Sequence, residues 1–451
     1  MARDGRNFDD VYVRAQQAFA RGAFDEAFAF CTEVLQDNQS ADFVDDLLRL
    51  KFMRMLLALA DVEWRGQLEI AGTVSIPKLL DDAEQLARDR NQKAILAQIM
   101  QLRAGWLMYR TGVMESIEML RSALAVARES QDKLTEFCVL SALGHQTVKL
   151  DMDEGIALLY RAQELFNIHT ESISSSDQAP ELQRLQRLAR ASLGINEFDR
   201  GNYDRALRML NDVLNDAERN AVTFDFPVIL NFLGQVEIAA GLFESAETHL
   251  KRAIALFENH DRPDPWNGNN LALLGKLYVE WERFEEATVP LERSWKESEP
   301  THNLDLISLV RNYYGEFLMH PRNVRRDVVR AEQILRDNLN ETRATSIHRS
   351  TIQSLTLLGR LMLDMNEREK ALAFSGEAVT LLEDLGNMPA LRMEEIYFNH
   401  YLILERLGQK NQAKAYLERA YGVIQVIDVA DTEKFLTRIP LNRAILSAHQ
   451  Q

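Results

Sequence analysis

Apolar residues recur along most of this chain at the spacing of amphipathic helices. In one stretch, Phe243, Ala246, Leu250, Ala253 and Phe257 follow one another at steps of three, four, three and four residues. This spacing places the five side chains on one stripe of a helix, which can then bury one side. Other stretches of the chain show the same periodicity and are separated by turn signals. The pattern therefore predicts an all-α protein built from short helices.

A second pattern is a glycine followed twelve residues later by a small or branched apolar residue. Gly275 leads to Ala287 in this way, and the same spacing starts at Gly105, Gly144, Gly194, Gly234 and Gly359. Successive glycines from Gly105 to Gly359, with Gly315 included, lie 39, 50, 40, 41, 40 and 44 residues apart. One helical hairpin in each period of about 40 residues is typical of a solenoid. Because a glycine inside a helix costs about 1 kcal/mol relative to alanine, its recurrence indicates close contact between the helices of each hairpin.

The turn between the two helices of a hairpin also repeats. The stretches 22–27, 201–206 and 241–246 each begin with glycine, carry an aromatic residue two positions later and end with alanine. A glycine at this place can end the first helix in a left-handed conformation. We therefore expect these glycines to be the C-terminal caps of their helices.

One repeat carries the residues of a known signature. Leu271, Leu274, Gly275, Tyr278 and Ala287 lie at the spacing of the tetratricopeptide repeat (TPR). The chain thus resembles long-period TPR arrays, such as those of kinesin light chains and the sensor regions of bacterial signalling ATPases and maltose-regulator-like proteins. The resemblance implies a right-handed superhelix whose concave groove, lined by the first helices of the hairpins, binds a protein or a peptide.

The predicted architecture is an all-α, right-handed α-solenoid of about nine TPR-like helical hairpins over residues 1–430, with a C-terminal cap at residues 431–451. The second repeat, residues 42–90, is irregular, because glycine and β-branched residues at 64–75 favour a loop or a short extended piece. A Ser-rich stretch at 171–180 predicts a surface loop. The cap is expected because the last apolar face of a solenoid has no neighbouring repeat.

Composition narrows the possible partners. The chain has 451 residues and a formal net charge of −16. Proteins that bind nucleic acid or an anionic membrane surface carry basic patches, so we expect neither partner. The sequence contains no run of about 20 apolar residues that would span a membrane, and its N-terminus lacks an apolar signal region. We therefore expect a cytoplasmic protein whose partner is another protein or a peptide.

No motif in the sequence points to catalysis. The phosphate-binding glycine loops, the nucleophile motif Gly-x-Ser-x-Gly and the metal motif His-Glu-x-x-His are all missing from the sequence. Its nine histidines are scattered, and no two lie three or four residues apart, as two metal ligands on one helix face would. We therefore predict a protein that is not an enzyme, with no catalytic residues, no metal site and no cofactor.

The TPR resemblance places the positions close to each glycine in the groove. In this chain these positions hold Trp106, Tyr109, Asn231, Gln235, Lys276, Asn312, Glu316 and Arg360. Asn231 and Asn312 share one register, and an amide can donate a hydrogen bond to a peptide backbone and accept one from it. We therefore predict that Asn231, Gln235, Asn312 and Glu316 contact a peptide or a partner helix. The alternative is that they are ordinary polar residues of the groove.

Two functions follow from these expectations. The first is a non-enzymatic scaffold or regulatory adaptor that binds a protein or a peptide in its concave groove. The alternative is a ligand- or peptide-sensing regulatory module of a bacterial signalling or transcription system. A scaffold would change shape little on binding, whereas a sensor would tighten its superhelix around a ligand.

Overall fold

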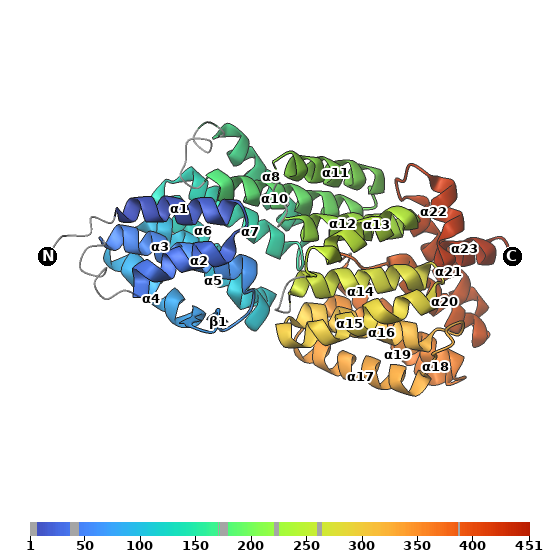
Figure 1. The fold of residues 1–451 in the computed structure, drawn as a ribbon. Coiled ribbons are helices and arrows are strands. Elements are labelled where there is room, and N and C mark those ends of the chain that lie inside the picture. Colours follow the sequence, from blue (N-terminus) through green and yellow to red (C-terminus); the bar gives the residue numbers. More distant parts are fainter. Residues whose placement is uncertain are drawn as a thin grey trace. The chain divides into compact units, whose positions relative to one another are not determined.

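The computed structural model describes residues 7–36, 45–169, 171, 179–220, 225–258, 264–386 and 388–451. These residues are almost entirely helical, and consecutive helices pack against each other in pairs (Figure 1). The contacts divide the chain into two compact units, Met1–Leu193 with Asn215–Asp225, and Gly194–Leu214 with Phe226–Gln451. The predicted all-α solenoid of helical hairpins is confirmed.

The first unit is built from four helix pairs and most of a further helix. Its helices are α1 (Phe8–Ala20), α2 (Phe24–Gln36), α3 (Asp46–Glu63), α4 (Ile76–Asp89), α5 (Lys93–Arg110), α6 (Val113–Ser130), α7 (Lys133–Thr147), α8 (Met152–Ile168) and most of α10 (Ala179–Asp199). One apolar core runs through them from Tyr12 in α1 to Leu182 in α10. Most of the predicted Ser-rich loop, residues 172–178, lies outside the described residues.

The second helix pair has the irregular insertion that its sequence predicts. Two short strands, β1 (Glu69–Ile70) and β2 (Val74–Ser75), form an antiparallel hairpin between α3 and α4. Helix α4 then begins with a proline in its first turn, where the missing backbone N–H of proline costs nothing. The insertion therefore adds an extended piece without interrupting the pairing of α3 with α4.

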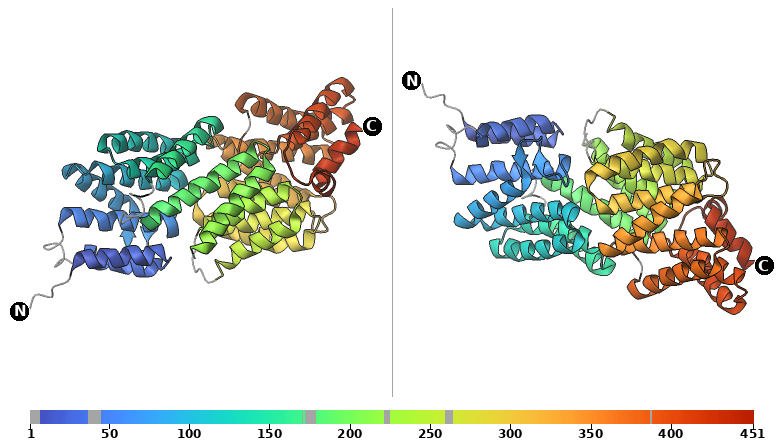
Figure 2. Two further views of the ribbon diagram at one scale, coloured as in Figure 1. Left: turned by 90° about the horizontal axis from the view of Figure 1, so that it is seen from above. Right: turned by 90° about the horizontal axis from the view of Figure 1, so that it is seen from below.

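The second unit continues the same arrangement. Its helices are α11 (Tyr203–Arg219), of which the first part belongs to this unit, α12 (Phe226–Ala239), α13 (Phe243–Ala255), α14 (Pro265–Glu280), α15 (Phe284–Ser298), α16 (Leu304–Met319), α17 (Val328–Ala344), α18 (His348–Asp364), α19 (Arg368–Leu385), α20 (Met393–Arg406), α21 (Lys410–Gln425), α22 (Thr432–Arg438) and α23 (Pro440–His449). Figure 2 shows these helices following one another in chain order. The described residues thus form ten pairs up to α21, where about nine were expected, and five of these pairs lie between residues 179 and 385.

Most of the recurrent glycines lie where the two helices of a pair approach each other closely. A Cβ atom built on Gly275 in α14 would lie 2.4 Å from Cγ of Leu291 in α15. Corresponding approaches of 2.8 to 3.0 Å separate Gly194, Gly234 and Gly315 from a leucine of the following helix. Distances below 3.0 Å are too short for a real Cβ contact. The glycine therefore makes room for a leucine one turn beyond the predicted alanine, and Ala287 itself is fully buried.

The turn glycines adopt the predicted left-handed conformation. Gly241, between α12 and α13, has φ of 75°. Its N–H donates to the carbonyl of Ile238 at 3.1 Å, and the N–H of Leu242 donates to the carbonyl of Glu237 at 2.8 Å. These two bonds satisfy carbonyl groups at the end of α12 that the helix itself leaves without a partner. The glycine allows the chain to reverse tightly into α13.

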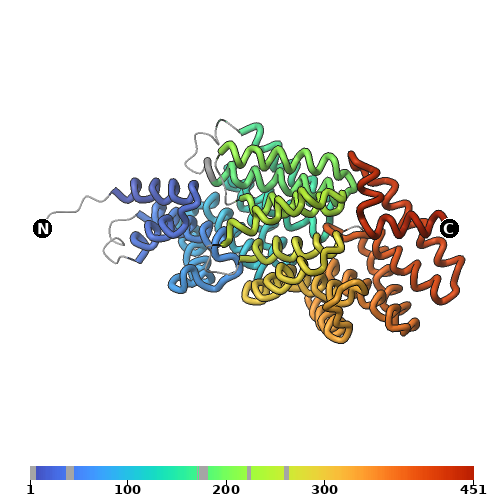
Figure 3. The backbone as a smooth tube through the Cα atoms, turned by 45° about the vertical axis from the view of Figure 1, so that its right-hand side comes forward, coloured from blue at the N-terminus to red at the C-terminus, as the bar shows by residue number. Residues whose placement is uncertain are grey.

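The C-terminal segment of the second unit, residues 426–451, contacts both the last repeat and the first repeats of this unit. Helix α23 packs on α21. The N–H of Asp428 donates to the carbonyl of Gly201 at 2.8 Å, and the N–H of Asp204 donates to the carbonyl of Asp428 at 3.2 Å. In α22, Arg438 forms two hydrogen bonds of 2.9 and 2.8 Å with Glu244 of α13. The end of the chain therefore lies beside the turn before α11 and the start of α13 (Figure 3).

Candidate functional site

Charged side chains from four helices of the second unit gather in one place. Consecutive first helices α14, α16, α18 and α20 pack side by side. Together with the residue that precedes α20, they contribute Lys276, Glu280, Glu316, Arg360, Arg392, Glu394 and Glu395. We call these seven residues the Lys276 cluster. It contains three of the eight side chains predicted for the groove, namely Lys276, Glu316 and Arg360.

Short ion pairs connect most of the Lys276 cluster. The Nζ atom of Lys276 lies 2.6 Å from Oε2 of Glu316 and 3.0 Å from Oε1 of Glu280. The guanidinium of Arg392 lies 3.2 Å from Glu280 and 2.8 Å from Glu394. These side chains retain between 7 and 24% of their exposure, so solvent screens the pairs far less than it would at the surface.

The ion pairs shift the pKa values of the cluster. Burial alone would raise the pKa of Glu280, but Lys276 and Arg392 outweigh burial and lower this pKa to about 2. Burial likewise opposes the charge on Lys276, yet Glu280 and Glu316 raise its pKa above the usual range of lysine. Because the attraction exceeds the cost of burial, Lys276 and Glu280 are both charged at neutral pH.

A pocket opens next to the Lys276 cluster. Its empty volume is about 320 Å³, part of which is open to solvent, and its walls are Glu316, Gln353, Thr356, Leu357, Leu391, Arg392, Glu395 and Ile396. The lining therefore combines polar and apolar side chains. Such a combination of apolar walls with a few convergent polar groups is typical of ligand-binding pockets in proteins.

The sequence did not predict the contribution of α20 to this site. Arg392, Glu394 and Glu395 lie at the start of the helix, well before Tyr401, which stands in the place of the repeat glycine. The positions expected to face the groove were counted from that glycine, so these three residues were missed. The two adjacent glutamates in the first turn of α20 resemble the acidic residues that favour any helix N-terminus, and nothing in the sequence separates the two roles.

Asn231 and Gln235 are hydrogen-bonded within the second unit. The Asn231 side chain is fully buried, and its Nδ2 donates to Oδ1 of Asn270 in α14 at 3.0 Å. Gln235 donates from Nε2 to Oδ1 of Asn231 at 2.7 Å. Asn270 in turn donates to the carbonyl of Pro227 at 3.2 Å. These amides connect α12 with α14.

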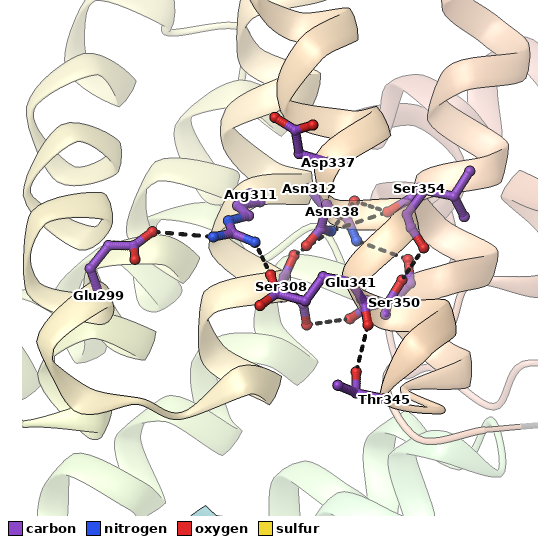
Figure 4. Close-up of polar contacts among 12 residues, drawn as sticks. Glu299, Ser308, Arg311, Asn312, Asp337, Asn338, Glu341, Thr345, Ser350 and Ser354 are labelled. Atoms are coloured by element: carbon purple, nitrogen blue, oxygen red, sulfur yellow. Dashed lines mark hydrogen bonds and ion pairs between the residues drawn. The ribbon is translucent and has the colours of Figure 1, made fainter.

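Asn312 has an equivalent position between α16 and α18 (Figure 4). Its Nδ2 donates to the carbonyl of Ser350 at 3.2 Å, and its Oδ1 accepts bonds from Ser354 at 2.7 Å and from Asn338 at 3.1 Å. The side chain of Asn312 is fully buried. The shared register of Asn231 and Asn312 therefore has a structural role, since each links one first helix to the next.

The burial of Asn231 and Asn312 bears on their predicted contact with a peptide. In this structure both amides bond to neighbouring helices and present no surface to a ligand. A peptide could reach Asn312 only if α16 and α18 first moved apart. The peptide contact of the two asparagines stays a prediction, whereas Gln353 and Glu316 line the pocket directly.

Trp106 and Tyr109, the other two predicted groove residues, belong to the first unit. They line a separate pocket of about 290 Å³ together with Asp61 and Gly105. The indole N–H of Trp106 donates to the carbonyl of Gln67 at 2.9 Å. A Cβ atom on Gly105 would lie 2.7 Å from Oδ1 of Asp61, so this glycine makes room for a carboxylate and not for a leucine.

Within the described ranges, no group of three or more His, Cys, Asp or Glu side chains is arranged to hold a metal ion. Among the helices of that same part of the chain, none combines the length and the apolar character needed to cross a membrane.

Comparison with known proteins identifies one repeat and the fold. The family model described as tetratricopeptide repeat matches residues 394–425, which correspond to α20 and α21. No curated protein matches the chain.

Several solved structures share the fold at low sequence identity. A Rap protein complexed with competence and sporulation factor is 14% identical, with a TM-score of 0.61 over 84% of this chain and 98% of that chain. The Rap conjugation gene regulator of plasmid pLS20, in complex with the Phr* peptide, is 13% identical with a TM-score of 0.53 over 84% of this chain and 95% of its own. The apo form of the quorum sensor NprR from B. thuringiensis is 11% identical, with a TM-score of 0.52 over 83% of this chain and 98% of that chain. The chain therefore contains a tetratricopeptide repeat and has the fold of a tetratricopeptide-type helical repeat protein, as its glycine spacing and its TPR signature predicted.

Proposed function

We propose that this protein is a non-enzymatic, peptide-binding regulatory module, and that a peptide binds at the pocket beside the Lys276 cluster. The observation that carries the proposal is the pocket itself. It lies where three consecutive first helices, α16, α18 and the start of α20, bring charged, amide and apolar side chains to one opening. The likeness of the fold to proteins solved with competence and sporulation factor and with the Phr* peptide supports a peptide as the ligand.

The chemistry of the pocket suits a short peptide. The Oε1 atom of Gln353 accepts a long hydrogen bond of 3.4 Å from Asn312. Its NH2 group and the second lone pair of this oxygen can still donate to and accept from a peptide unit. Leu357, Leu391 and Ile396 offer apolar surface for a side chain. The net charge of −16 disfavours a nucleic acid or an anionic membrane as the partner. A short ligand is favoured over a large protein partner, because eight residues line the pocket, whereas a stable protein–protein interface usually involves about 20 to 30 residues on each side.

A pool of randomised hexapeptides tests this function. The protein is mixed with the pool and passed through a gel-filtration column, and the peptides that elute with it are identified by mass spectrometry. We expect the wild type to retain a defined subset of peptides. The variant Gln353→Ala should retain about tenfold less of the same peptides, since the loss of one hydrogen bond to the ligand costs about 1 to 1.5 kcal/mol.

Gln333→Ala is the matched control. Gln333 is exposed on α17, where its amide bonds to Asp337, and it does not line the pocket. This variant should retain peptides as the wild type does. The proposal would be overturned if the wild type retained no peptide, or if Gln353→Ala and Gln333→Ala bound the same peptides equally well.

A further inference from the structure

The pocket beside the Lys276 cluster contains one charged group that is not committed to a close partner. Of its three charged residues, Glu316 pairs with Lys276 at 2.6 Å, and Arg392 hydrogen-bonds to Glu394 and Glu280. Glu395 differs from both. Its nearest cation among the described residues is Arg360, whose guanidinium nitrogen lies 3.8 Å away.

A distance of 3.8 Å is too long for a hydrogen bond. Among the described residues, no hydrogen bond to the Glu395 carboxylate is recorded, although its side chain is only 18% exposed. Arg360 at 31% exposure keeps much of its contact with water. The Glu395 carboxylate is thus shielded from much of the solvent and receives no hydrogen bond from the described residues. A ligand that donates a hydrogen bond to it would therefore gain a favourable interaction.

The charges of the Lys276 cluster also favour the binding of one further cation. Glu280, Glu316, Glu394 and Glu395 are four carboxylates, while Lys276, Arg360 and Arg392 are three cations. With every group ionised, four negative and three positive charges leave the cluster one cation short. Lys276 and Arg392 each pair with two other carboxylates already. Neither therefore forms a close ion pair with Glu395.

Burial raises the pKa of the Glu395 carboxyl. Lys276 on α14 lowers this pKa, Glu316 on α16 raises it, and Arg392 beside α20 and Arg360 on α18 lower it. The effect of burial on this pKa therefore exceeds the opposing effect of the three cations. A further cation at the carboxylate would change this balance, because a close opposite charge favours the ionised form.

We infer that the pocket receives a positively charged group of the bound peptide, an ammonium or a guanidinium, which forms a hydrogen-bonded ion pair with Glu395. This inference rests on the proposed function, since it assumes a peptide at the pocket. The apolar wall of Leu357, Leu391 and Ile396 covers the methylene groups that carry such a charge, as lysine and arginine stems commonly pack on apolar surface. Among the residues that line the pocket the cation is Arg392, and an anionic group there would have to compete with Glu394 and Glu280, to which Arg392 already donates hydrogen bonds.

Two sources can supply the positive charge: the N-terminal ammonium of the peptide or a lysine or arginine side chain. Three hexapeptide pools distinguish them. The first is N-acetylated and contains Lys and Arg, the second has a free N-terminus and no Lys or Arg, and the third is N-acetylated and has neither cationic residue. We expect the protein to retain the first or the second pool, which identifies the source, and to retain the third at least tenfold less.

Three variants connect the result to the carboxylate. Glu395→Gln removes the charge while keeping the shape, and should reduce retention of the cationic pool about tenfold or more, as loss of a charged hydrogen bond does. Arg360→Gln removes the cation that lies nearest to Glu395, and should increase retention a few-fold. Glu377→Gln makes the same chemical change on the surface of α19, where Glu377 pairs with Arg343, and should leave retention unchanged. Thermal unfolding of each variant shows whether it is folded.

The outcomes separate this inference from the proposed function. Equal retention of all three pools would preserve a peptide-binding protein and overturn the role of a cation. Undiminished retention of the cationic pools by folded Glu395→Gln would also overturn it. If Glu395→Gln does not fold, Arg360→Gln decides, and a decrease or no change in retention counts against the inference. Retention of no pool by the wild type would overturn the proposed function and the inference with it.

Discussion

The ammonium of Lys276 in α14 lies 2.6 Å from a carboxylate oxygen of Glu316 in α16, and both side chains are nearly removed from solvent. The two residues are forty positions apart, which is one period of the repeat. Each is the position next to its repeat glycine, Gly275 and Gly315. A buried ion pair between equivalent positions of adjacent repeats therefore connects the first helices of the second unit.

Loss of Lys276 should destabilise the protein strongly. In Lys276→Met, Glu316 and Glu280 would keep their buried charges without the ammonium, and breaking one side of a buried pair costs about 3 to 5 kcal/mol. The double variant Lys276→Met/Glu316→Leu should lose clearly less than the sum of the two single variants, because no unpaired charge remains at position 316. Urea unfolding of the four proteins of this cycle measures the coupling. If the losses of unfolding free energy in the two single variants simply added up in the double variant, Lys276 and Glu316 would not be coupled as described.

The sequence predicted this relationship in part. Counting from Gly275 and Gly315 placed Lys276 and Glu316 on the same face of successive hairpins, because the repeat period fixes which residues are equivalent. The same counting also placed Asn231 and Asn312 on the groove side, and the structure buries both. Register gives the direction of a side chain relative to its own helix, but the distance to the next helix depends on the packing of many residues.

The repeat pattern could not predict the part of the site that comes from α20 and the residue before it. Arg392 precedes α20 by one residue, and Glu395 lies in its first turn, so neither is at a position that the glycine period marks. The contact of Arg392 with Glu280, more than a hundred residues earlier, depends on how the residue before α20 approaches α14. That arrangement follows from the sum of the turns between successive hairpins, which no local pattern specifies.

Glu280 should make the stability of the protein sensitive to acid. Its folded-state pKa of about 2 lies below the ordinary value of 4.5. Since the folded pKa is depressed, the contribution of Glu280 is fully present above pH 4.5 and is lost as pH falls towards 2, with an upper size of about 3 kcal/mol. Urea unfolding between pH 7 and pH 3 measures the loss.

The variant Glu280→Gln isolates this effect. Its free energy of unfolding should be lower than that of the wild type at pH 7, and the difference should shrink as pH falls below 4.5. Glu383→Gln is the control, because Glu383 is an exposed carboxylate of α19 that pairs with Arg419. Its acid dependence should match that of the wild type. A difference between Glu280→Gln and wild type that stays constant across this range would contradict the pKa assignment.

Gly275→Ala should destabilise the protein although alanine is the better helix former. The new Cβ would lie 2.4 Å from Cγ of Leu291, and overpacking of this kind typically costs 1 to 3 kcal/mol, against a gain of about 1 kcal/mol in helix propensity. Gly376→Ala in α19 is the matched control, since a Cβ there meets nothing within 4 Å. This second variant should be more stable than the wild type by up to about 1 kcal/mol. Thermal or urea unfolding tests the predicted loss of stability in Gly275→Ala and the predicted gain in Gly376→Ala. Stabilisation by Gly275→Ala would show that α14 and α15 can accommodate a methyl group at this position.

The contact of the C-terminal segment with the start of the second unit should depend on Phe435 far more than on Arg438. Phe435 is 3% exposed, and its ring meets Tyr203 edge-on at a centroid distance of 6.0 Å. Phe435→Ala should therefore cost about 3 to 5 kcal/mol. Arg438 forms two good hydrogen bonds with Glu244, but Glu244 keeps 66% of its exposure, so Arg438→Ala should cost less than about 1 kcal/mol.

Hydrogen exchange at Asp204 locates this effect, because its amide donates to Asp428 only while the segment is in place. Exchange at that amide should accelerate strongly in Phe435→Ala and little in Arg438→Ala, while amides in the middle of α16 stay protected in both. If Phe435→Ala instead accelerated exchange throughout the second unit, the segment would be part of its general core and not a separable contact. If neither variant changed exchange at Asp204, the segment would not hold the turn before α11 in solution.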